Sequence, residues 1–173
     1  HPIAGTEKSG PENGFKNLFK DKWFISTDCN LCNEKNIEYI NSMWKKFGSK
    51  VITMKSKDHD SVMAITSHIP HLIAYNIVGT ASELEEDIKS EVIKFSASGF
   101  RDFTRIASSD PVMWRDIMLS NKDEIILLFE KFNNDLKQIL DAIKKDDGDF
   151  LVKKFKKTRE IRKKIIEAGL DKN

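Results

Sequence analysis

Cysteine, proline and glycine are scarce in this chain, whose 173 residues include only 2 Cys, 4 Pro and 8 Gly. Two cysteines cannot make a disulfide framework, so we expect a reducing compartment and a cytoplasmic protein. The low proline and glycine content, beside 39% hydrophobic and 9% aromatic residues, excludes a disordered chain. An excess of charge of one sign is missing too, because 29 Lys and Arg face 27 Asp and Glu. This balance gives no argument for a nucleic-acid partner.

Long hydrophobic runs are also absent. No apolar stretch approaches the roughly 18 residues that a membrane helix requires, so we expect no membrane-spanning segment. The chain opens with His1-Pro2 rather than with Met or an apolar leader. Its length is close to the ~150 residues of an average domain. Together these features predict the C-terminal part of a longer protein.

The strand signals lie in residues 1–57. Two short β-prone runs occupy Trp23–Thr27 and Val51–Met54. Apolar residues recur every three or four positions over residues 37–47, as on the buried face of a helix, and Gly48 suits the position after its end. Such a βαβ unit cannot cover both faces of a parallel sheet alone. We therefore predict the last βαβ of a doubly wound nucleotide-binding domain.

Residues 58–173 show helix signals without a convincing strand, which makes the predicted fold mainly α. Apolar positions at helical spacing run through residues 62–77, where Pro70 is expected to kink the helix. A capping box at residues 82–85 opens a helix to about Lys94. We expect a domain boundary at residue 57, with a helical substrate-binding and dimerisation domain after it.

Three further helices are predicted towards the end of the chain. The Asp-Pro pair at residues 110–111 is an N-cap followed by proline at the first helical position. The cap-like pair of Asn and Glu at residues 121–124 opens the longest helix, whose apolar stripe spans residues 125–143. Asp149 is expected to cap a last helix that ends near Gly169.

Histidine is the first candidate for chemistry. His1 lies in a stretch, residues 1–10, that also holds hydroxyl, acidic, basic and glycine residues. An imidazole can take a proton from a substrate hydroxyl near neutral pH, although an ordinary surface loop is the alternative. His68 and His71 share one side of a helix and could hydrogen-bond a ligand or a neighbouring helix. No metal site is predicted there, because no other ligand completes a set, and residues 58–60 are interpreted as the polar entry to the helix.

An anion site is the second candidate. The small residues 96–99 precede Arg101 and Arg105, which lie four positions apart. Two guanidinium groups on one helix face match a carboxylate or a phosphate. In the alternative interpretation, Arg101 pairs with Asp102 or Glu91 on a solvated surface.

Two other patterns are assigned no chemistry. The CxxC at residues 29–32 has no second pair to complete a zinc set and no redox context. The lysine-rich residues 153–164 carry apolar residues at helical spacing. We interpret them as a solvated helix face rather than as a nucleic-acid-binding stripe.

Four stretches carry motifs that occur together, in this order, in one known family. They are His1-Pro2-Ile3-Ala4-Gly5-Thr6-Glu7, Ser67-His68-Ile69-Pro70-His71, residues 99–107 (GFRDFTRIA) and residues 109–116 (SDPVMWRD). These motifs resemble the prephenate and arogenate dehydrogenases of tyrosine biosynthesis. The resemblance covers nearly the whole chain and is looser over residues 29–50 and after Asp146.

This resemblance implies an oxidoreductase that acts on prephenate or arogenate. NAD or NADP would take a hydride from the ring carbon that bears the hydroxyl, and the ring carboxylate would leave as carbon dioxide. His1 would hydrogen-bond the hydroxyl and help to withdraw its proton, and Arg105 would bind a substrate carboxylate. His71 would lie in the substrate pocket and be associated with tyrosine inhibition. The remaining implied pocket residues are Asp102, Ser98 and Trp114, the last reaching across from the partner subunit.

The same resemblance implies an intertwined homodimer, in which the long apolar stripes pack together. The alternative is that the stripes fill only the chain's own core. One departure is that no GxGxxG motif follows a strand, so the cofactor-binding residues are expected upstream of His1. We therefore expect no turnover by this chain alone.

Two other functions stay open at this point. One is a non-catalytic helical module that binds tyrosine or a related aromatic acid. The other is a purely structural helical dimer with its arginine pair on the surface. Sequence upstream of His1 would separate the enzyme from the binding module, because only the enzyme requires the glycine-rich turn.

Overall fold

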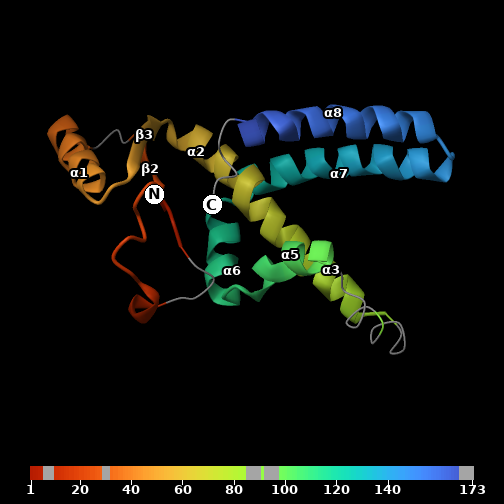
Figure 1. The fold of residues 1–173 in the computed structure, drawn as a ribbon, viewed down its shortest axis with the longest axis horizontal. Helices are drawn as coiled ribbons and strands as arrows, with labels where there is room; N and C mark the ends of the chain where they lie inside the picture. The colour runs from red at the N-terminus through yellow and green to blue at the C-terminus, as the bar shows by residue number, and fades with distance from the viewer. Residues whose placement is uncertain (6–9, 29–31, 85–90, 92–97, 168–173) are drawn as a thin grey trace. The chain divides into compact units, whose positions relative to one another are not determined.

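The computed structural model describes residues 1–5, 10–28, 32–84, 91 and 98–167. The described chain is mainly helical and contains one three-stranded sheet, which confirms the predicted fold class (Figure 1). It forms two compact units, His1–Leu128 and Phe129–Asn173. In the described residues, no helix has both the length and the apolar character needed to cross a membrane.

The sheet contains the predicted βαβ unit. Strands β2 (Trp23–Thr27) and β3 (Lys50–Met54) pair in parallel, and helix α1 (Glu34–Lys46) makes the crossover between them. Gly48, two residues after α1, has a φ of 86°, a left-handed conformation that favours glycine. The βαβ prediction is therefore confirmed.

A third strand, β1 (Pro2–Ile3), corrects the expectation that the chain starts as a loop. It pairs antiparallel with β2, and Pro2 lies opposite Phe24. The backbone nitrogen of His1 donates to the Ile25 carbonyl at 2.8 Å, and the Ile25 amide donates back at 2.9 Å. Pro2 lacks an N–H but occupies a pair that needs none, because hydrogen-bonded and non-hydrogen-bonded pairs alternate in an antiparallel ladder. The ladder thus fixes the backbone of His1.

Helix α1 packs on the sheet mainly through Trp44. The Trp44 ring stacks on Phe24 with centroids 4.5 Å apart, and Phe19 meets its edge. The rest of the predicted buried face is open, since Ile40 is 40% exposed and Phe47 is 51% exposed. The predicted buried face is therefore only partly covered in this chain.

The helix around Pro70 is interrupted by a π-helical turn. Helix α2 (Ser56–Met63) continues through a π-helical turn, η2 (Ala64–His68), into helix α3 (Ile69–Ser82). Pro70 has no N–H to donate and its ring crowds the carbonyl of the preceding turn. The wider π turn directly before α3 accommodates both effects.

The buried face of this segment agrees with the predicted stripe only in part. The buried residues are Met63, Ala64, Ile69 and Ala74. Ile69 belongs to the predicted stripe, whereas Val62 and Ile65, also expected in the core, are 40% and 50% exposed. Val62 lies before the π turn, so the turn does not account for its exposure.

After a stretch that is mostly outside the described residues come α5 (Ser98–Thr104), η3 (Arg105–Ser108, a 3₁₀ turn) and α6 (Pro111–Ser120). The predicted N-cap of α6 is confirmed, since the Asp110 carboxylate accepts a hydrogen bond from the Met113 amide at 2.7 Å. Helix α6 thereby begins at a defined residue.

Ser82, predicted to open a helix as part of a capping box at residues 82–85, instead ends one. Ser82 is the last residue of α3, and its hydroxyl donates to the Gly79 carbonyl at 2.7 Å. Most of the helix expected up to Lys94 lies outside the described residues.

The second unit contains most of α7 (Lys122–Lys144) and all of α8 (Gly148–Glu167), which lie side by side (Figure 1). Lys154 of α8 reaches Asp135 of α7, with Nζ 3.2 Å from Oδ1. Asp147, rather than the predicted Asp149, caps α8 by accepting from the Phe150 amide at 2.9 Å.

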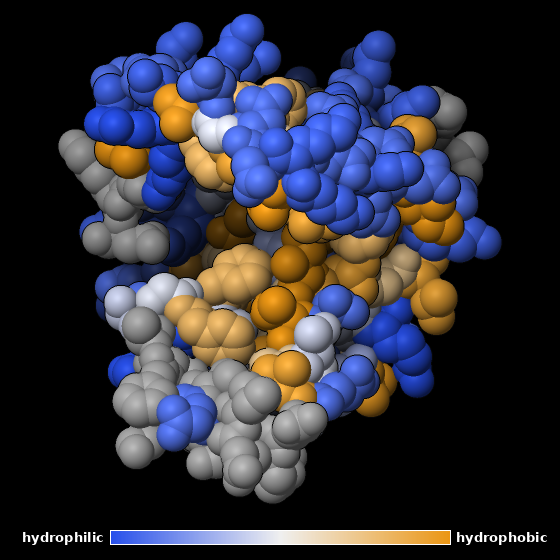
Figure 2. All heavy atoms as spheres, turned by 90° about the vertical axis from the view of Figure 1, so that its right-hand side faces the viewer, coloured by the Kyte–Doolittle hydropathy of each residue, from blue (hydrophilic) through white to orange (hydrophobic). Residues whose placement is uncertain are grey.

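Large hydrophobic side chains remain exposed on these helices. Examples are Leu136, Leu140, Ile143, Val152, Phe155 and Ile161, each 40–54% exposed. Figure 2 shows hydrophobic side chains exposed at the surface among the charged ones. The core of this chain therefore leaves much of the apolar stripes exposed.

Candidate active site

A cavity of about 600 Å³ lies where β1 meets the helices of the first unit. His1 and Gly5 line it from the N-terminal segment. Ser67, His71 and Trp114 line it from the helical part. Residues from the two ends of the first unit therefore meet around one space.

A second hollow of about 330 Å³ adjoins the first, because both are lined by Gly5, His71 and Trp114. Arg105 lines the second hollow. An imidazole of His1 and a guanidinium of Arg105 thus border neighbouring spaces. This arrangement suits a ligand that carries a hydroxyl at one point and a carboxylate at another.

The structure brings together four of the six site residues named from the sequence. They are His1, His71, Arg105 and Trp114. Asp102 and Ser98 lie exposed on α5 and line neither cavity. Gly5 and Ser67 were not among the named site residues, although both lie in stretches that carry the resemblance.

His71 is held from two directions. Its Nδ1 donates to the Ser67 carbonyl at 2.8 Å, and its ring stacks on Trp114 with centroids 3.5 Å apart. Burial lowers the pKa of His71 below its ordinary value of 6.5, and the hydrogen bond to Ser67 opposes this shift. His71 is therefore neutral at pH 7, with Nε2 left as an acceptor.

Trp114 belongs to α6, and within this chain its ring stacks on His71. Its indole is 7% exposed, and within the described residues its Nε1 has no hydrogen-bond partner. The edge of His68 also faces Trp114, with centroids 6.2 Å apart. The two histidines therefore share one side of the helix, as their spacing predicted.

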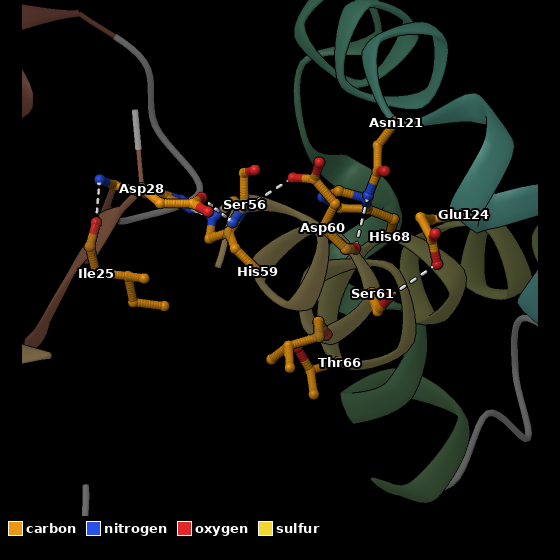
Figure 3. A network of polar contacts seen from close by, with 12 residues as sticks. Ile25, Asp28, Ser56, His59, Asp60, Ser61, Thr66, His68, Asn121 and Glu124 are labelled. Atoms are coloured by element: carbon orange, nitrogen blue, oxygen red, sulfur yellow. Dashed lines mark hydrogen bonds and ion pairs between the residues drawn. The ribbon is translucent and has the colours of Figure 1, made fainter. Parts of the chain in front are cut away.

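A histidine pair that the sequence did not single out adjoins this site. His1 Nδ1 lies 2.7 Å from His59 Nε2. His59 Nδ1 lies 2.9 Å from Asp60 Oδ1, and both residues appear in Figure 3. Sequence analysis assigned His59 and Asp60 only to the polar entry of a helix. Nothing in the sequence indicates that residues so far apart along the chain meet.

The predicted capping pair of α7 holds α2 instead. Asn121 donates through Nδ2 to the Asp60 carbonyl at 2.8 Å and lies 3.2 Å from His68 Nδ1. Glu124 accepts from the Ser61 hydroxyl at 2.8 Å (Figure 3). Both side chains therefore turn away from their own helix start and fix the helix that carries His59.

Asp28, directly after β2, ties the sheet to the start of α2. Its carboxylate accepts from the Ser56 amide at 2.6 Å (Figure 3). This hydrogen bond lowers the pKa of Asp28 below its ordinary value of 3.8. The helix that bears His59 is thus fixed to the strand that pairs with His1.

A third cavity, of about 480 Å³, opens at the carboxyl end of β2. His1, Thr27, Asn33 and Asn36 bring polar groups to it. Ligands of parallel α/β sheets bind beyond the carboxyl ends of the strands, so the position suits a polar ligand. Cys32 also lines this cavity.

Metal ligation has no support in the described part of the chain. No group of three or more His, Cys, Asp or Glu residues there is arranged to hold a metal ion.

Family models and known proteins match this arrangement. Residues 1–53 match the nucleotide-binding domain of prephenate dehydrogenase, and residues 55–157 match its dimerization domain. The chain therefore belongs to the prephenate dehydrogenase family.

Two relatives illustrate the extent of the likeness. The chain is 40% identical to a cyclohexadienyl dehydrogenase of Zymomonas mobilis, over 94% of this chain and 55% of that protein. It is 34% identical to a prephenate dehydrogenase of Bacillus subtilis, over 94% of this chain and 43% of that protein. The chain thus spans about half the length of these relatives.

Solved structures agree with this assignment. Prephenate dehydrogenase from A. aeolicus, in complex with hydroxyphenyl propionate and NAD⁺, superposes with a TM-score of 0.88 at 36% identity. The match covers 95% of this chain and 57% of that one. Synechocystis arogenate dehydrogenase, at 22% identity and a TM-score of 0.82, supports the fold.

Proposed function

We propose that this chain supplies the substrate-binding part of the active site of a prephenate or arogenate dehydrogenase that uses NAD or NADP. The observation that carries the proposal is the meeting of His1 with His71, Arg105 and Trp114 around two adjoining cavities. Hydroxyphenyl propionate, bound by the A. aeolicus relative, has the hydroxyl and the carboxylate that such a site would accept.

In this mechanism His1 acts as a general base and Arg105 as an anion clamp. Arg105 binds a carboxylate of the substrate and orients the ring towards His1. His1 Nε2 accepts the hydroxyl proton as hydride leaves the carbon that bears the oxygen. The ring carboxylate departs as carbon dioxide, and its bonding electrons complete the aromatic ring.

A nicotinamide, when bound, is the hydride acceptor. The cavity at the carboxyl end of β2, to which His1, Asn33 and Asn36 bring polar groups, would fit the amide end of such a group. The sequence has no GxGxxG motif, so residues beyond those of this chain would hold the pyrophosphate. On this proposal the chain alone does not turn over.

The stacked pair of His71 and Trp114 supports an aromatic ligand. Their rings form one wall of both cavities, and the product of the reaction is itself an aromatic ring. Tyrosine shares that ring, so we propose that it competes for the same space. Asp102 and Ser98 are proposed to contribute from the rim, because α5 directly precedes Arg105.

The proposed protein is a homodimer with a domain boundary near residue 57. The exposed apolar stripes of α7 and α8 support self-association, since a stable interface requires such surface. Helix α2 begins at Ser56, close to the proposed boundary.

The test is turnover by the complete protein that contains this chain. Prephenate and arogenate are each supplied with NAD and then with NADP, and the absorbance of reduced nicotinamide is followed. We expect turnover with one substrate and its loss in the His1→Asn variant. A folded dimer that turns over neither substrate but binds tyrosine would refute the enzyme and support the non-catalytic module.

A further inference from the structure

We propose that His59, held by Asp60, is a positioning residue that sets the protonation of His1 and shares its positive charge during the reaction. This inference rests on the proposed function, because it concerns the base of that reaction. It assigns a role to a histidine and a carboxylate that line none of the cavities described above.

The three groups form a continuous hydrogen-bonded chain. His1 Nδ1 and His59 Nε2 are 2.7 Å apart, and their rings meet edge to face at 69°. His59 Nδ1 and Asp60 Oδ1 are 2.9 Å apart. The His59 side chain is 16% exposed and that of Asp60 is 49% exposed, so the series of hydrogen bonds runs from the cavity towards solvent.

The partners decide which ring nitrogens carry protons. A carboxylate only accepts, so the Nδ1 of His59 must be the donor to Asp60. When His59 is neutral, its Nε2 is therefore unprotonated and accepts from the Nδ1 of His1. The Nε2 of His1 is then left unprotonated, which is the form that a base towards a substrate hydroxyl requires.

The surrounding structure holds His1, His59 and Asp60 in place. The backbone of His1 is fixed by its two hydrogen bonds to Ile25. Asp28 ties the start of α2 to the sheet, and Asn121 holds the Asp60 carbonyl. Preorganisation of this kind places a proton acceptor without further ordering during the reaction.

Each proton that moves along the His1–His59–Asp60 hydrogen bonds has a defined donor and acceptor. The O–H bond of the substrate breaks and its proton joins His1 Nε2. The Nδ1 proton of His1 then passes to His59 Nε2. The positive charge arrives beside the negative Asp60, which stabilises it.

Several other titratable or charged groups lie on the elements packed around His59. They are His68 on η2, Asp28 after β2, Lys55 before α2, Asp58 on α2 and Lys22, which lines the cavity beside His1. Among them, His68 and His59 repel each other when charged. Asp60 is the carboxylate in direct contact with His59.

The kinetic test uses the complete protein and four variants. We expect His59→Leu to lower kcat about 10- to 100-fold, less than the ~10²–10⁴-fold of a general base, with little change in KM. His59→Gln keeps an acceptor for His1 and should recover part of this loss. Asp60→Asn should move the acidic limb of the kcat profile to lower pH, because a lost carboxylate disfavours the protonated pair.

Asp58→Asn is the matched control, because it removes the same charge from an exposed position on the same helix. It should change neither kcat nor the pH at which the acidic limb of the kcat profile falls. A purely structural role of Asp60 would lower kcat at every pH without moving the limb. Turnover that is unaffected by His59→Leu and Asp60→Asn would overturn the proposal.

A second measurement does not depend on activity. Long-range ¹H–¹⁵N NMR of labelled histidine reports which ring nitrogen is protonated. Above the acidic limb we expect protonated Nδ1 and unprotonated Nε2 for both His1 and His59. Nε2 protonation of either ring would overturn the proposal. Absent turnover with the expected protonation would refute the proposed reaction and still support the His1–His59–Asp60 arrangement.

Discussion

Arg105 and Arg101 lie four residues apart, yet only Arg105 borders a cavity with His71 and Trp114. The spacing of the two residues predicted an anion site for the pair, and only the family resemblance singled out Arg105. The division depends on the change from α5 to the η3 turn, which begins at Arg105. That change redirects the side chain relative to the preceding helix.

We therefore expect Arg105→Ala to weaken binding of hydroxyphenyl propionate by about 10- to 100-fold. Loss of a hydrogen bond to a charged group costs roughly 1.5–3 kcal/mol, which corresponds to that range. Arg101→Ala is the matched control and should leave affinity nearly unchanged. Isothermal titration calorimetry on the complete protein measures both. Equal effects of the two substitutions would contradict the assignment.

His68 and His71 make stability depend on pH. Burial lowers the pKa of each below 6.5, so the unfolded chain binds more protons than the folded chain just below that pH. Stability is then fully present above about pH 6.5 and declines as the pH falls through this window. Thermal unfolding between pH 8 and pH 5, with His68→Gln/His71→Gln for comparison, measures the effect. The double variant should show a smaller decline; an equal decline would contradict the prediction.

At the scale of elements, the sequence predicted contacts between neighbouring residues well. It did not predict contacts between residues far apart in the chain. The Asp110 cap involves residues three positions apart, so its sequence pattern determines the contact. Asn121 and Glu124 show the same kind of pattern, but their side chains bind Asp60 and Ser61, about 60 positions away. A competing tertiary partner of this kind leaves no local signal.

The cap of α6 provides a test at this scale. Asp110→Ala should lower the free energy of unfolding by about 1 kcal/mol, because the Met113 amide loses its acceptor. Asp116→Ala is a control on the same helix, where the pair with Arg115 is 61% exposed on both sides. Exposed pairs contribute about 0–1 kcal/mol. Urea unfolding distinguishes them, and equal losses would contradict the role of the cap.

At the scale of the molecule, the mainly helical fold and the βαβ unit followed from hydrophobic periodicity. The buried face of the α2–α3 segment followed only in part, since Ile69 is buried as predicted but Val62 and Ile65 are exposed. The His1–His59 contact also escaped prediction, since β1 is only two residues long and pairs through a proline-containing ladder. Strand pairing over such distances is set by the whole sheet.

The exposed stripes predict self-association of the complete protein. Leu140 and Ile143 are 47% and 54% exposed on α7, so an aspartate at either position would place a charge in the proposed interface. We expect Leu140→Asp to shift the protein from dimer to monomer in sedimentation equilibrium. Lys137→Asp, on the same helix, is the control. A Leu140→Asp protein that remains dimeric would contradict this interface.

The most direct test of the central claim is a crystal structure of the complete protein with hydroxyphenyl propionate and NAD⁺. We expect the ligand hydroxyl within hydrogen-bond distance of His1 Nε2, its ring beside His71 and Trp114, and its carboxylate on Arg105. His1 Nδ1 should remain on His59. A ligand bound away from these cavities, or with its carboxylate at His1 and its hydroxyl at Arg105, would contradict the account.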